Sequence, residues 1–187
     1  FNPIGDFGSK NNFKGSFDGN GYVIENLYIN RGSTNYVGLF GYTDSVAVIE
    51  NVGLLNENIT GNDYVGGLIG SNKGNVENCH FTGDVTGNTS VGGLVGYVNS
   101  GSVSNCYSTG SVAGSSNSVG GLVGTNDAIV SNCYSTVENV SGDYEVGGLI
   151  GFNWSSVSGC YSAAESVTGN SDVGGFVGED FEGSYEN

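Results

Sequence analysis

Short apolar stretches separated by glycine and small polar residues recur along the whole chain. One signature occurs six times: a valine, one or two glycines, a large apolar residue, a second apolar residue and a glycine. Its copies are YVGLFG (36–41), YVGGLIG (64–70), SVGGLVG (90–96), SVGGLVG (118–124), EVGGLIG (145–151) and DVGGFVG (172–178). The large apolar residues follow one another at steps of 29, 26, 28, 27 and 27 residues. This regularity predicts a repeat architecture with one structural unit per period.

Two further apolar segments lie between successive copies. The stronger one reads IENLYI (24–29), IENVGL (49–54), VENCHF (76–81), VSNCYS (103–108), VSNCYS (130–135) and VSGCYS (157–162). The weaker one reads NIT (58–60), DVT (84–86), SVA (111–113), NVS (139–141) and SVT (166–168). Segments this short bury their apolar side chains only by stacking, about 4.8 Å apart, on the next coil. We therefore predict an all-β fold: a parallel β-solenoid (β-helix) of about six coils of ~27 residues, with three short strands per coil.

Equivalent positions in successive coils form columns, and the cysteine column shows the register most clearly. Cys79, Cys106, Cys133 and Cys160 lie 27 residues apart, and Leu27 and Val52 occupy the same position upstream. The apolar members indicate a structural ladder that points inward and holds free, buried thiols. Zinc ligation would need a CxxC-like spacing, which is absent. Disulfides between stacked neighbours are sterically conceivable, although parallel Cβ vectors disfavour them.

The residue after each member of the cysteine column should point outward, because side chains alternate along a strand. This column contains Tyr28, Gly53, His80, Tyr107, Tyr134 and Tyr161. The stripe Tyr107–Tyr134–Tyr161 is a candidate binding surface for a sugar or a partner protein; alternatively, it is an aromatic ladder that stabilises stacked strands. The residue before each cysteine is usually Asn, which tolerates left-handed turns and so predicts a corner.

Composition and charge narrow the functional classes. The chain has 35 Gly but one Pro, without a Gly-X-Y period, which excludes collagen. Four basic and 19 acidic residues give a net charge of −15, which argues against nucleic acid and anionic membranes as partners. No apolar run is long enough to insert into a membrane. We expect no catalytic residues, metal ligands or cofactor; Ca²⁺ at Asp6 or in the turn 18–21 is a weaker alternative to a simple glycine-rich turn.

The motif residues GLFG, GLIG, GLVG, GLVG, GLIG and GFVG resemble the GLUG repeats, named for Gly-Leu-hydrophobic-Gly. Phe176 departs from the motif's leucine. The segment 13–29 resembles the lead-in that precedes such arrays, and residues 1–23 are expected to cap the N-terminal end of a single domain spanning 1–187. The resemblance implies an extracellular or cell-surface protein, of which this chain is expected to be a fragment, and it transfers no catalytic residue.

These observations favour a non-catalytic structural or adhesive module, such as a stalk, a surface-layer unit or a filament building block. Expected partners are neighbouring domains or like subunits that stack on the end coils, with glycans or host and cell-surface proteins as further candidates. A glycan-binding module using the tyrosine stripe is the alternative function. Ice binding is a third hypothesis, based on the outward column Thr60, Thr86, Ala113, Ser141 and Thr168. An enzyme is not expected, because the acidic residues share no column across three consecutive coils and His80 has no second histidine beside it.

Overall fold

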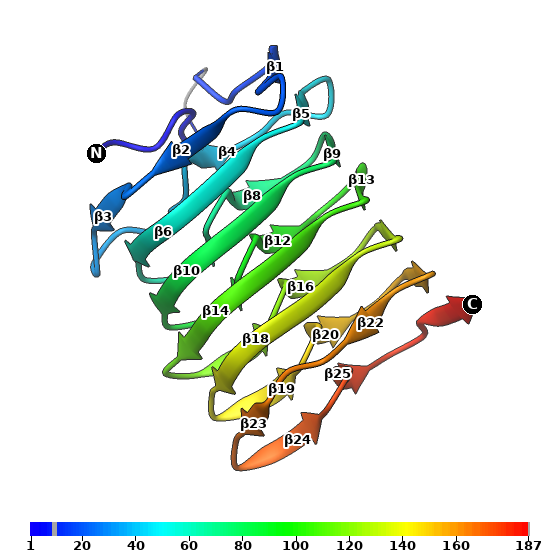
Figure 1. The fold of residues 1–187 in the computed structure, drawn as a ribbon. Helices are drawn as coiled ribbons and strands as arrows, with labels where there is room; N and C mark the ends of the chain where they lie inside the picture. Colours follow the sequence, from blue (N-terminus) through cyan, green and yellow to red (C-terminus); the bar gives the residue numbers. More distant parts are fainter. Residues whose placement is uncertain (9–10, 187) are drawn as a thin grey trace.

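The chain winds into a stack of β-coils with its termini at opposite ends (Figure 1). The computed structural model describes residues 1–8 and 11–186, and every regular element among them is a β-strand. The strands described pair in parallel with those of the next coil, for example β10 with β14. The predicted parallel β-solenoid of about six coils is thus confirmed. In this part of the chain, no helix meets the length and hydropathy needed to cross a bilayer.

The strands form four sheets that run along the stack. Sheet I contains β1 (Ser16–Asp18), β5 (Val48–Glu50), β9 (Asn75–Glu77), β13 (Ser102–Ser104), β17 (Ile129–Ser131), β21 (Ser156–Ser158) and β26 (Ser184–Glu186). Sheet II contains β2 (Val23–Glu25), β3 (Tyr28–Asn30), β6 (Gly53–Thr60), β10 (His80–Gly87), β14 (Tyr107–Gly114), β18 (Tyr134–Ser141), β22 (Tyr161–Ser162) and β23 (Ser166–Thr168). Sheet III contains β7 (Val65–Gly66), β11 (Val91–Gly92), β15 (Asn117–Gly120), β19 (Tyr144–Gly147) and β24 (Ser171–Gly174). Sheet IV contains β4 (Phe40–Tyr42), β8 (Ile69–Asn72), β12 (Val95–Val98), β16 (Val123–Asn126), β20 (Ile150–Asn153) and β25 (Val177–Asp180).

A complete coil has four strands, so the prediction of three strands per coil was wrong. The glycine-rich signature is not a single strand: its Val-Gly part belongs to sheet III and its final part to sheet IV, with a turn at Gly-Leu between them. The stronger second segment also divides, and its final Tyr-Ser or His-Phe pair merges with the weaker third segment into one long strand, as in β10 and β14. Because a corner separates sheets III and IV, the apolar column that begins at Phe40 and Ile69 lies in the core.

The glycines of the signature lie where a side chain would collide with backbone. A Cβ atom on Gly93 would lie 2.3 Å from the carbonyl oxygen of Gly121 in the next coil. A Cβ on Gly96 would lie 2.6 Å from the carbonyl oxygen of Gly70. The signature therefore marks a corner at which neighbouring coils approach too closely for any larger residue.

The corner between sheets I and II carries the predicted asparagine column. The φ angles of this column are left-handed in successive coils: 56° at Asn51, 53° at Asn78, 54° at Asn105, 52° at Asn132 and 58° at Gly159. Asparagine adopts this left-handed conformation more readily than most residues because its short polar side chain bonds locally. The change of chain direction between sheets I and II is thus encoded at one position in each coil.

The first coil departs from the predicted register. Val23 and Ile24 pair with Gly53 and Leu54, whereas β3 pairs further along the same strand, with Tyr28 opposite Asn58. Leu27 therefore lies outside the Val52–cysteine column, and Tyr28 lies outside the tyrosine column. The physical reason is that two short strands, β2 and β3, separated by the left-handed Asn26, share the single long strand β6.

The segment before β2 packs on the end of the first coil. Ile4 donates its backbone N–H to the carbonyl of Leu39 at 2.8 Å, and Phe13 donates to Tyr42 at 3.0 Å. The rings of Phe13 and Phe17 lie 4.8 and 5.4 Å from that of Phe40. These contacts cover the otherwise open backbone and core at this end.

A continuous apolar core runs between the sheets, built mainly of valine, leucine and isoleucine. One inward column of sheet II changes from Leu54 and Phe81 to the buried Ser108 and Ser135. Ser108 donates its hydroxyl to the carbonyl oxygen of Gly121 at 2.6 Å, whereas the buried hydroxyl of Ser135 has no hydrogen-bond partner among the described residues.

Glu57 is the charged residue that enters this interior. It lies beside an irregularity where β6 has one more residue than β10, and its side chain is 3% exposed. Both carboxylate oxygens are buried without a hydrogen-bond partner. Burial raises the pKa of Glu57 to about 7.

Replacing Gly121 by alanine should destabilise the solenoid, because the new Cβ would lie 2.2 Å from the carbonyl oxygen of Gly148. We expect a loss of about 2 kcal/mol or more in the free energy of unfolding, measured by urea titration. Gly175 is the matched control: it holds the same position in the last coil, where a Cβ meets nothing within 4 Å. Equal losses for Gly121→Ala and Gly175→Ala would contradict this account of the motif.

Glu57→Gln should remove a pH dependence of stability. An acid whose pKa is raised in the folded state stabilises the fold fully at pH values below its unfolded pKa. That stabilisation is lost as the pH rises towards the folded pKa, which is about 7 for Glu57. Wild-type stability should therefore fall between about pH 4.5 and 7, by at most about 3 kcal/mol relative to the variant. Urea titrations at pH 5 and pH 8 measure the difference. Glu138→Gln is the control, because Glu138 is the extra residue of a similar irregularity in β18 but is exposed. This variant should keep the wild-type pH dependence, and its loss there to the same extent as in Glu57→Gln would refute the assignment.

Candidate functional site

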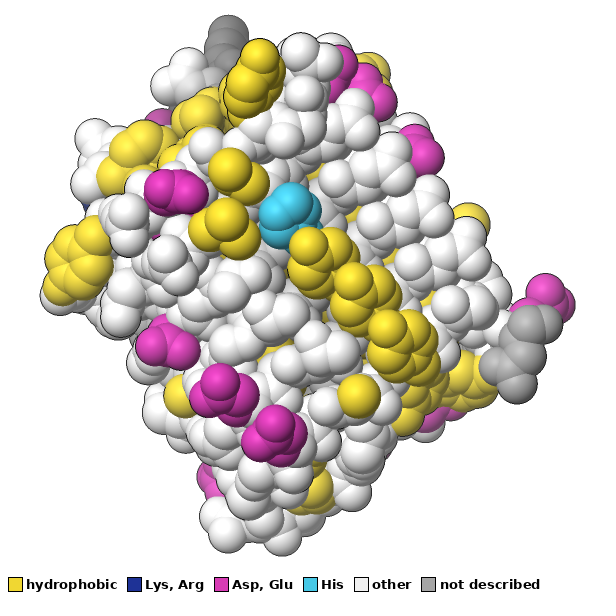
Figure 2. Space-filling view, in the orientation of Figure 1, with side chains coloured by type: hydrophobic (Ala, Val, Ile, Leu, Met, Phe, Trp, Pro, Cys, Tyr) yellow, Lys and Arg dark blue, Asp and Glu magenta, His cyan; other side chains and the backbone are white. Residues whose placement is uncertain are grey.

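The three tyrosines of the predicted stripe form, together with His80, a regular aromatic ladder on sheet II. His80, Tyr107, Tyr134 and Tyr161 occupy successive rungs, with ring centroids 4.9, 4.8 and 5.0 Å apart and interplanar angles of 4° or less. The rings appear as a stripe that runs from the cyan histidine across the visible face (Figure 2). Rings that repeat at the strand spacing stack face to face, because the parallel register places each directly over the previous one.

The same stacking covers the aromatic faces. Each inner ring has a neighbour on both sides, so mainly its edge and its polar atoms reach solvent. At the upper end, His80 and Val23 close over Gly53: a Cβ on Gly53 would lie 2.6 Å from the imidazole and 2.3 Å from the valine. At the lower end, Tyr161 is 52% exposed. The ladder therefore presents a row of phenol hydroxyls, and its ring faces stabilise the stack.

The cysteine column lies one residue before this ladder and points inward. The column is buried at Cys79, Cys106 and Cys133 and half-buried at Cys160 in the last coil. All four cysteines are free thiols. Each thiol donates to the carbonyl oxygen two residues before it, for example from Cys106 to Ser104 at 3.0 Å. Each of the last three sulfurs also accepts the backbone N–H of the preceding cysteine, as from Cys79 to Cys106 at 3.4 Å. The sulfur atoms therefore satisfy inward-facing amides next to the asparagine corner.

Burial keeps Cys79, Cys106 and Cys133 away from solvent, and hydrogen bonds within the column lower the pKa of Cys79 and Cys133 while they raise the pKa of Cys106. Hydrogen bonds with Cys133 and Cys79, together with burial, raise the pKa of Cys106 well above its ordinary value. A thiolate is the reactive form of cysteine, so a raised pKa and burial both make Cys106 inert. Across residues 1–8 and 11–186, no three His, Cys, Asp or Glu side chains are grouped so that they could hold a metal ion.

Two other predicted surfaces have clear structural positions. The hydroxyl-bearing column is in register on sheet II, with Thr86 opposite Thr60 on one side and Ala113 on the other. Ala113 interrupts it, so the column offers no unbroken hydroxyl array. In the turn at 18–21, Asp18 accepts the backbone N–H of Asn20 at 2.7 Å and the side-chain amide of Asn51 at 2.9 Å. Those two hydrogen bonds lower the pKa of Asp18, whose carboxylate holds the turn together.

A buried amide ladder in sheet IV was not predicted. Asn126 donates to Asn153 at 2.8 Å, Asn153 donates to Asp180 at 2.7 Å, and Asn72 accepts the hydroxyl of Thr43 at 2.7 Å. The signal was present in the sequence, because Asn126 and Asn153 follow the signature at the same offset, 27 residues apart. Val98 holds this position between Asn72 and Asn126, and the gap hid the pattern.

A cluster of aromatic side chains near the N-terminal end was also missed. We call it the tyrosine groove; it contains Phe7, Tyr36, Tyr42, Tyr64 and Tyr97. Tyr36 and Tyr64 begin the first two copies of the signature, but Phe7 and Tyr97 lie outside it. Only the folded chain brings the five rings together.

Comparison with known families places the repeat. Residues 61–86, 87–113 and 115–141 each match the GLUG motif, so the resemblance noted in the sequence is confirmed over three repeats. Each matched segment contains one copy of the glycine-rich signature and nearly all of one long strand of sheet II. Three successive segments of the solenoid thus carry the GLUG motif.

Two proteins share sequence with part of the chain. Halomucin from Haloquadratum walsbyi is 45% identical over 73 residues, which cover 39% of this chain and 1% of halomucin. A protein named "Putative Gly-rich membrane protein" from Evansella cellulosilytica is 40% identical over 79 residues, 41% of this chain and 9% of that protein. The matches thus span a small part of both relatives.

A solved structure has the same fold. The crystal structure of a "putative immunoglobulin A1 protease" from Bacteroides ovatus superposes with a TM-score of 0.74 at 25% sequence identity. The alignment covers 91% of this chain and 58% of that one. This likeness supports the β-solenoid architecture.

The buried cysteines should resist alkylation until the protein unfolds. With iodoacetamide at neutral pH, we expect Cys79, Cys106 and Cys133 to stay unmodified in the native state and to react fully in guanidinium, because folding removes them from solvent. The half-buried Cys160 should react first. Mass spectrometry of chymotryptic peptides, which place each cysteine on a separate fragment, gives the rates, and Thr86→Cys, at an exposed position of β10, supplies a reactive control. Labelling of native Cys106 at the control rate would show that the ladder is open.

Proposed function

We propose that this GLUG-repeat chain is a non-catalytic structural module of an extracellular or cell-surface protein, which acts as a rigid spacer. The observation that carries the proposal is the continuity of the four parallel sheets along the stack. Each coil is hydrogen-bonded to its neighbours on several sides at once, so bending the rod would break ladders in more than one sheet. At about 4.8 Å per coil, six coils give a rod roughly 29 Å long.

The chemically reactive side chains serve this architecture. The imidazole of His80 stacks on Tyr107, and the cysteine thiols bond to backbone groups in the interior. The imidazole and the thiols are thus committed to packing. The GLUG matches and the likeness to part of halomucin fit a repeat protein better than an enzyme.

The net negative charge of the surface favours a rod that stays separate from neighbouring rods in water. The net charge is −15, and carboxylates are distributed among neutral polar side chains over the face shown in Figure 2. Like charges on neighbouring rods repel one another, which limits sideways association and leaves the ends as the favoured contacts. Together with the membrane-protein name of one relative, this supports a place at the cell surface.

The end coil supplies a surface for further stacking. In β24, Val173 is 43% exposed, whereas the equivalent Val146 one coil earlier is fully buried. Phe181 and Tyr185 are also about half exposed. A further coil placed over this end would bury the same apolar columns and pair the open strand edges. We propose that the partner at this end is a like coil, either from a neighbouring domain or from a like subunit.

Adhesion through the Tyr107–Tyr134–Tyr161 stripe receives less support than the spacer role. Sugars bind aromatic side chains chiefly through the ring faces, and those faces are stacked on one another here. The stripe is therefore proposed as a stabilising ladder.

Removing one whole coil tests the spacer function. Asn117 pairs with Tyr144, so deletion of residues 118–144 joins Asn117 to Glu145 and keeps every column in register. We expect a folded rod about 4.8 Å shorter, with Tyr107 stacked on Tyr161, as measured by circular dichroism and small-angle X-ray scattering.

The matched control removes half a coil, residues 118–131, and moves each following strand onto the wrong sheet. This variant should not fold, because its apolar columns would face solvent. If the whole-coil deletion unfolds as completely as the half-coil deletion, the repeats are not interchangeable spacer units and the proposal fails.

A further inference from the structure

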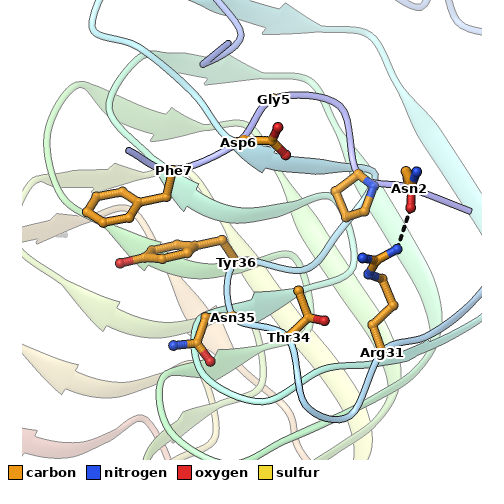
Figure 3. Close-up of a pocket in the computed structure, with 9 residues that line it drawn as sticks. Asn2, Gly5, Asp6, Phe7, Arg31, Thr34, Asn35 and Tyr36 are labelled. Carbon is orange, nitrogen blue, oxygen red and sulfur yellow. Dashed lines mark hydrogen bonds between the residues drawn. The ribbon is translucent and has the colours of Figure 1, made fainter. Parts of the chain in front are cut away.

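The tyrosine groove differs from the tyrosine ladder in being hollow. It contains two adjoining cavities of about 280 and 220 Å³, which share Phe7 and Tyr36. In the first cavity, Phe7 lies over Tyr36, while Arg31, Thr34 and Asn35 line the opposite side (Figure 3). The second cavity extends from these rings towards Tyr64 and Tyr97.

Two columns create the hollow. Tyr36 and Tyr64 hold the position before the signature valine and have φ angles of 60° and 58°. On sheet IV, Tyr42, Ser71 and Tyr97 hold successive rungs of one column. The small Ser71 side chain interrupts an aromatic ladder, so the space that a third ring would fill stays open.

The rings of the groove differ in tilt: Tyr36 is stacked between Phe7, at 4.5 Å, and Tyr64, whereas Tyr42 and Tyr97 are inclined to their neighbours. Tyr36 and Tyr64 stack at 4.8 Å, but Tyr36 meets Tyr42 at an interplanar angle of 82°. Tyr64 and Tyr97 are tilted by 32° at 5.8 Å. Tyr42 is buried, so the aromatic surface that the hollow offers comes from the exposed Phe7 and the half-buried Tyr64 and Tyr97.

Basic side chains border the groove alongside acidic ones, because Asp6 also lines the first cavity and Asp127 accepts the hydroxyl of Tyr97 at the second. Of the four Lys and Arg residues, Arg31 lines the first cavity and Lys73 the second. Their partners are neutral groups: Arg31 donates to the side-chain oxygen of Asn2, and the Lys73 ammonium lies 5.6 Å from the centroid of the Tyr42 ring. Neither cation forms an ion pair with a carboxylate among residues 1–8 and 11–186, so a carboxylate on a ligand could pair with both.

Polar groups along the rim are held in place. The Tyr97 hydroxyl donates to Asp127 and accepts from the side-chain amide of Asn99 at 2.8 Å. Thr34 and Asn35 add a hydroxyl and an amide at the first cavity. The site thus combines aromatic walls, fixed hydrogen-bonding groups and two cations.

We propose that the tyrosine groove binds a saccharide chain that carries carboxylate groups. Sugar rings offer apolar C–H faces to the exposed and half-buried rings of the groove and hydroxyls to the amide and hydroxyl groups of the rim. The sugar carboxylates pair with Lys73 and Arg31, and sites of this mixed apolar and polar character orient small ligands. This site is separate from the Tyr107–Tyr134–Tyr161 stripe and goes beyond the spacer function, because a rod can hold its shape without a ligand.

Titration calorimetry with tetragalacturonate at low ionic strength tests the proposal. Wild-type protein should bind, Tyr64→Ala should weaken binding at least about tenfold, and Lys73→Gln should weaken it several-fold. Tyr134→Ala is the matched control, because it removes a stacked tyrosine far from the groove and should leave binding unchanged. Circular dichroism shows whether Tyr64→Ala is folded; if it is not, Lys73→Gln decides the matter, since it leaves the ring stack intact.

Three further arms identify the ligand chemistry. The neutral tetramer maltotetraose should bind more weakly than tetragalacturonate, and its affinity should not change in Lys73→Gln. Added salt should weaken only the acidic sugar, because it screens charge pairs. Equal binding of a tetraglutamate peptide would overturn the saccharide assignment, and equal binding of the neutral sugar would overturn the role of the carboxylate. Absence of binding to wild type, or an equal loss with Tyr134→Ala, would overturn the site itself without affecting the test of the spacer by coil deletion.

Discussion

Parallel hydrogen bonding between successive coils is the interaction on which the rest of this structure depends. It operates in four sheets at once and places each residue directly over its equivalent, as for Tyr107 over His80. The strands of a single coil contain only two to eight residues, too few to bury a core alone. Stability therefore comes from repetition, and every column must tolerate a neighbour about 4.8 Å away.

This spacing explains the unusual composition. Backbones meet closely at the corner between sheets III and IV, and glycine is required wherever a Cβ would touch the next coil, as at Gly93. At the corner between sheets I and II, the left-handed Asn105 turns the chain, and the sulfur of Cys106 accepts an amide that the turn leaves facing inward. The GLUG motif is thus a description of corner geometry: the leucine fills the core, and the glycines allow the coils to approach.

The same repetition decides what the surface can do. Where like aromatic residues follow one another, they stack and hide their faces, as Tyr107 and Tyr134 do. A surface suited to a ligand arises where a column changes, as at Ser71 between Tyr42 and Tyr97. In a solenoid, binding sites are therefore expected at interruptions of the ladders, and the regular stretches between them provide length and stiffness.

The sequence by itself determined the period, the parallel stacking, the inward cysteine column and the asparagine corner, because these depend on residues that recur at a constant spacing. It did not determine that a coil has four strands, since a turn within Val-Gly-Gly-Leu leaves no separate signal in the apolar pattern. It also misplaced Leu27 and Tyr28, because β2 and β3 both pair with β6 and this choice depends on a partner strand some 30 residues away. The burial of Glu57 and the meeting of Phe7 with Tyr36, Tyr42, Tyr64 and Tyr97 were likewise decided only by the tertiary structure. Local periodicity specifies which residues stack, whereas the first coil and the irregular positions depend on packing between segments that share no pattern.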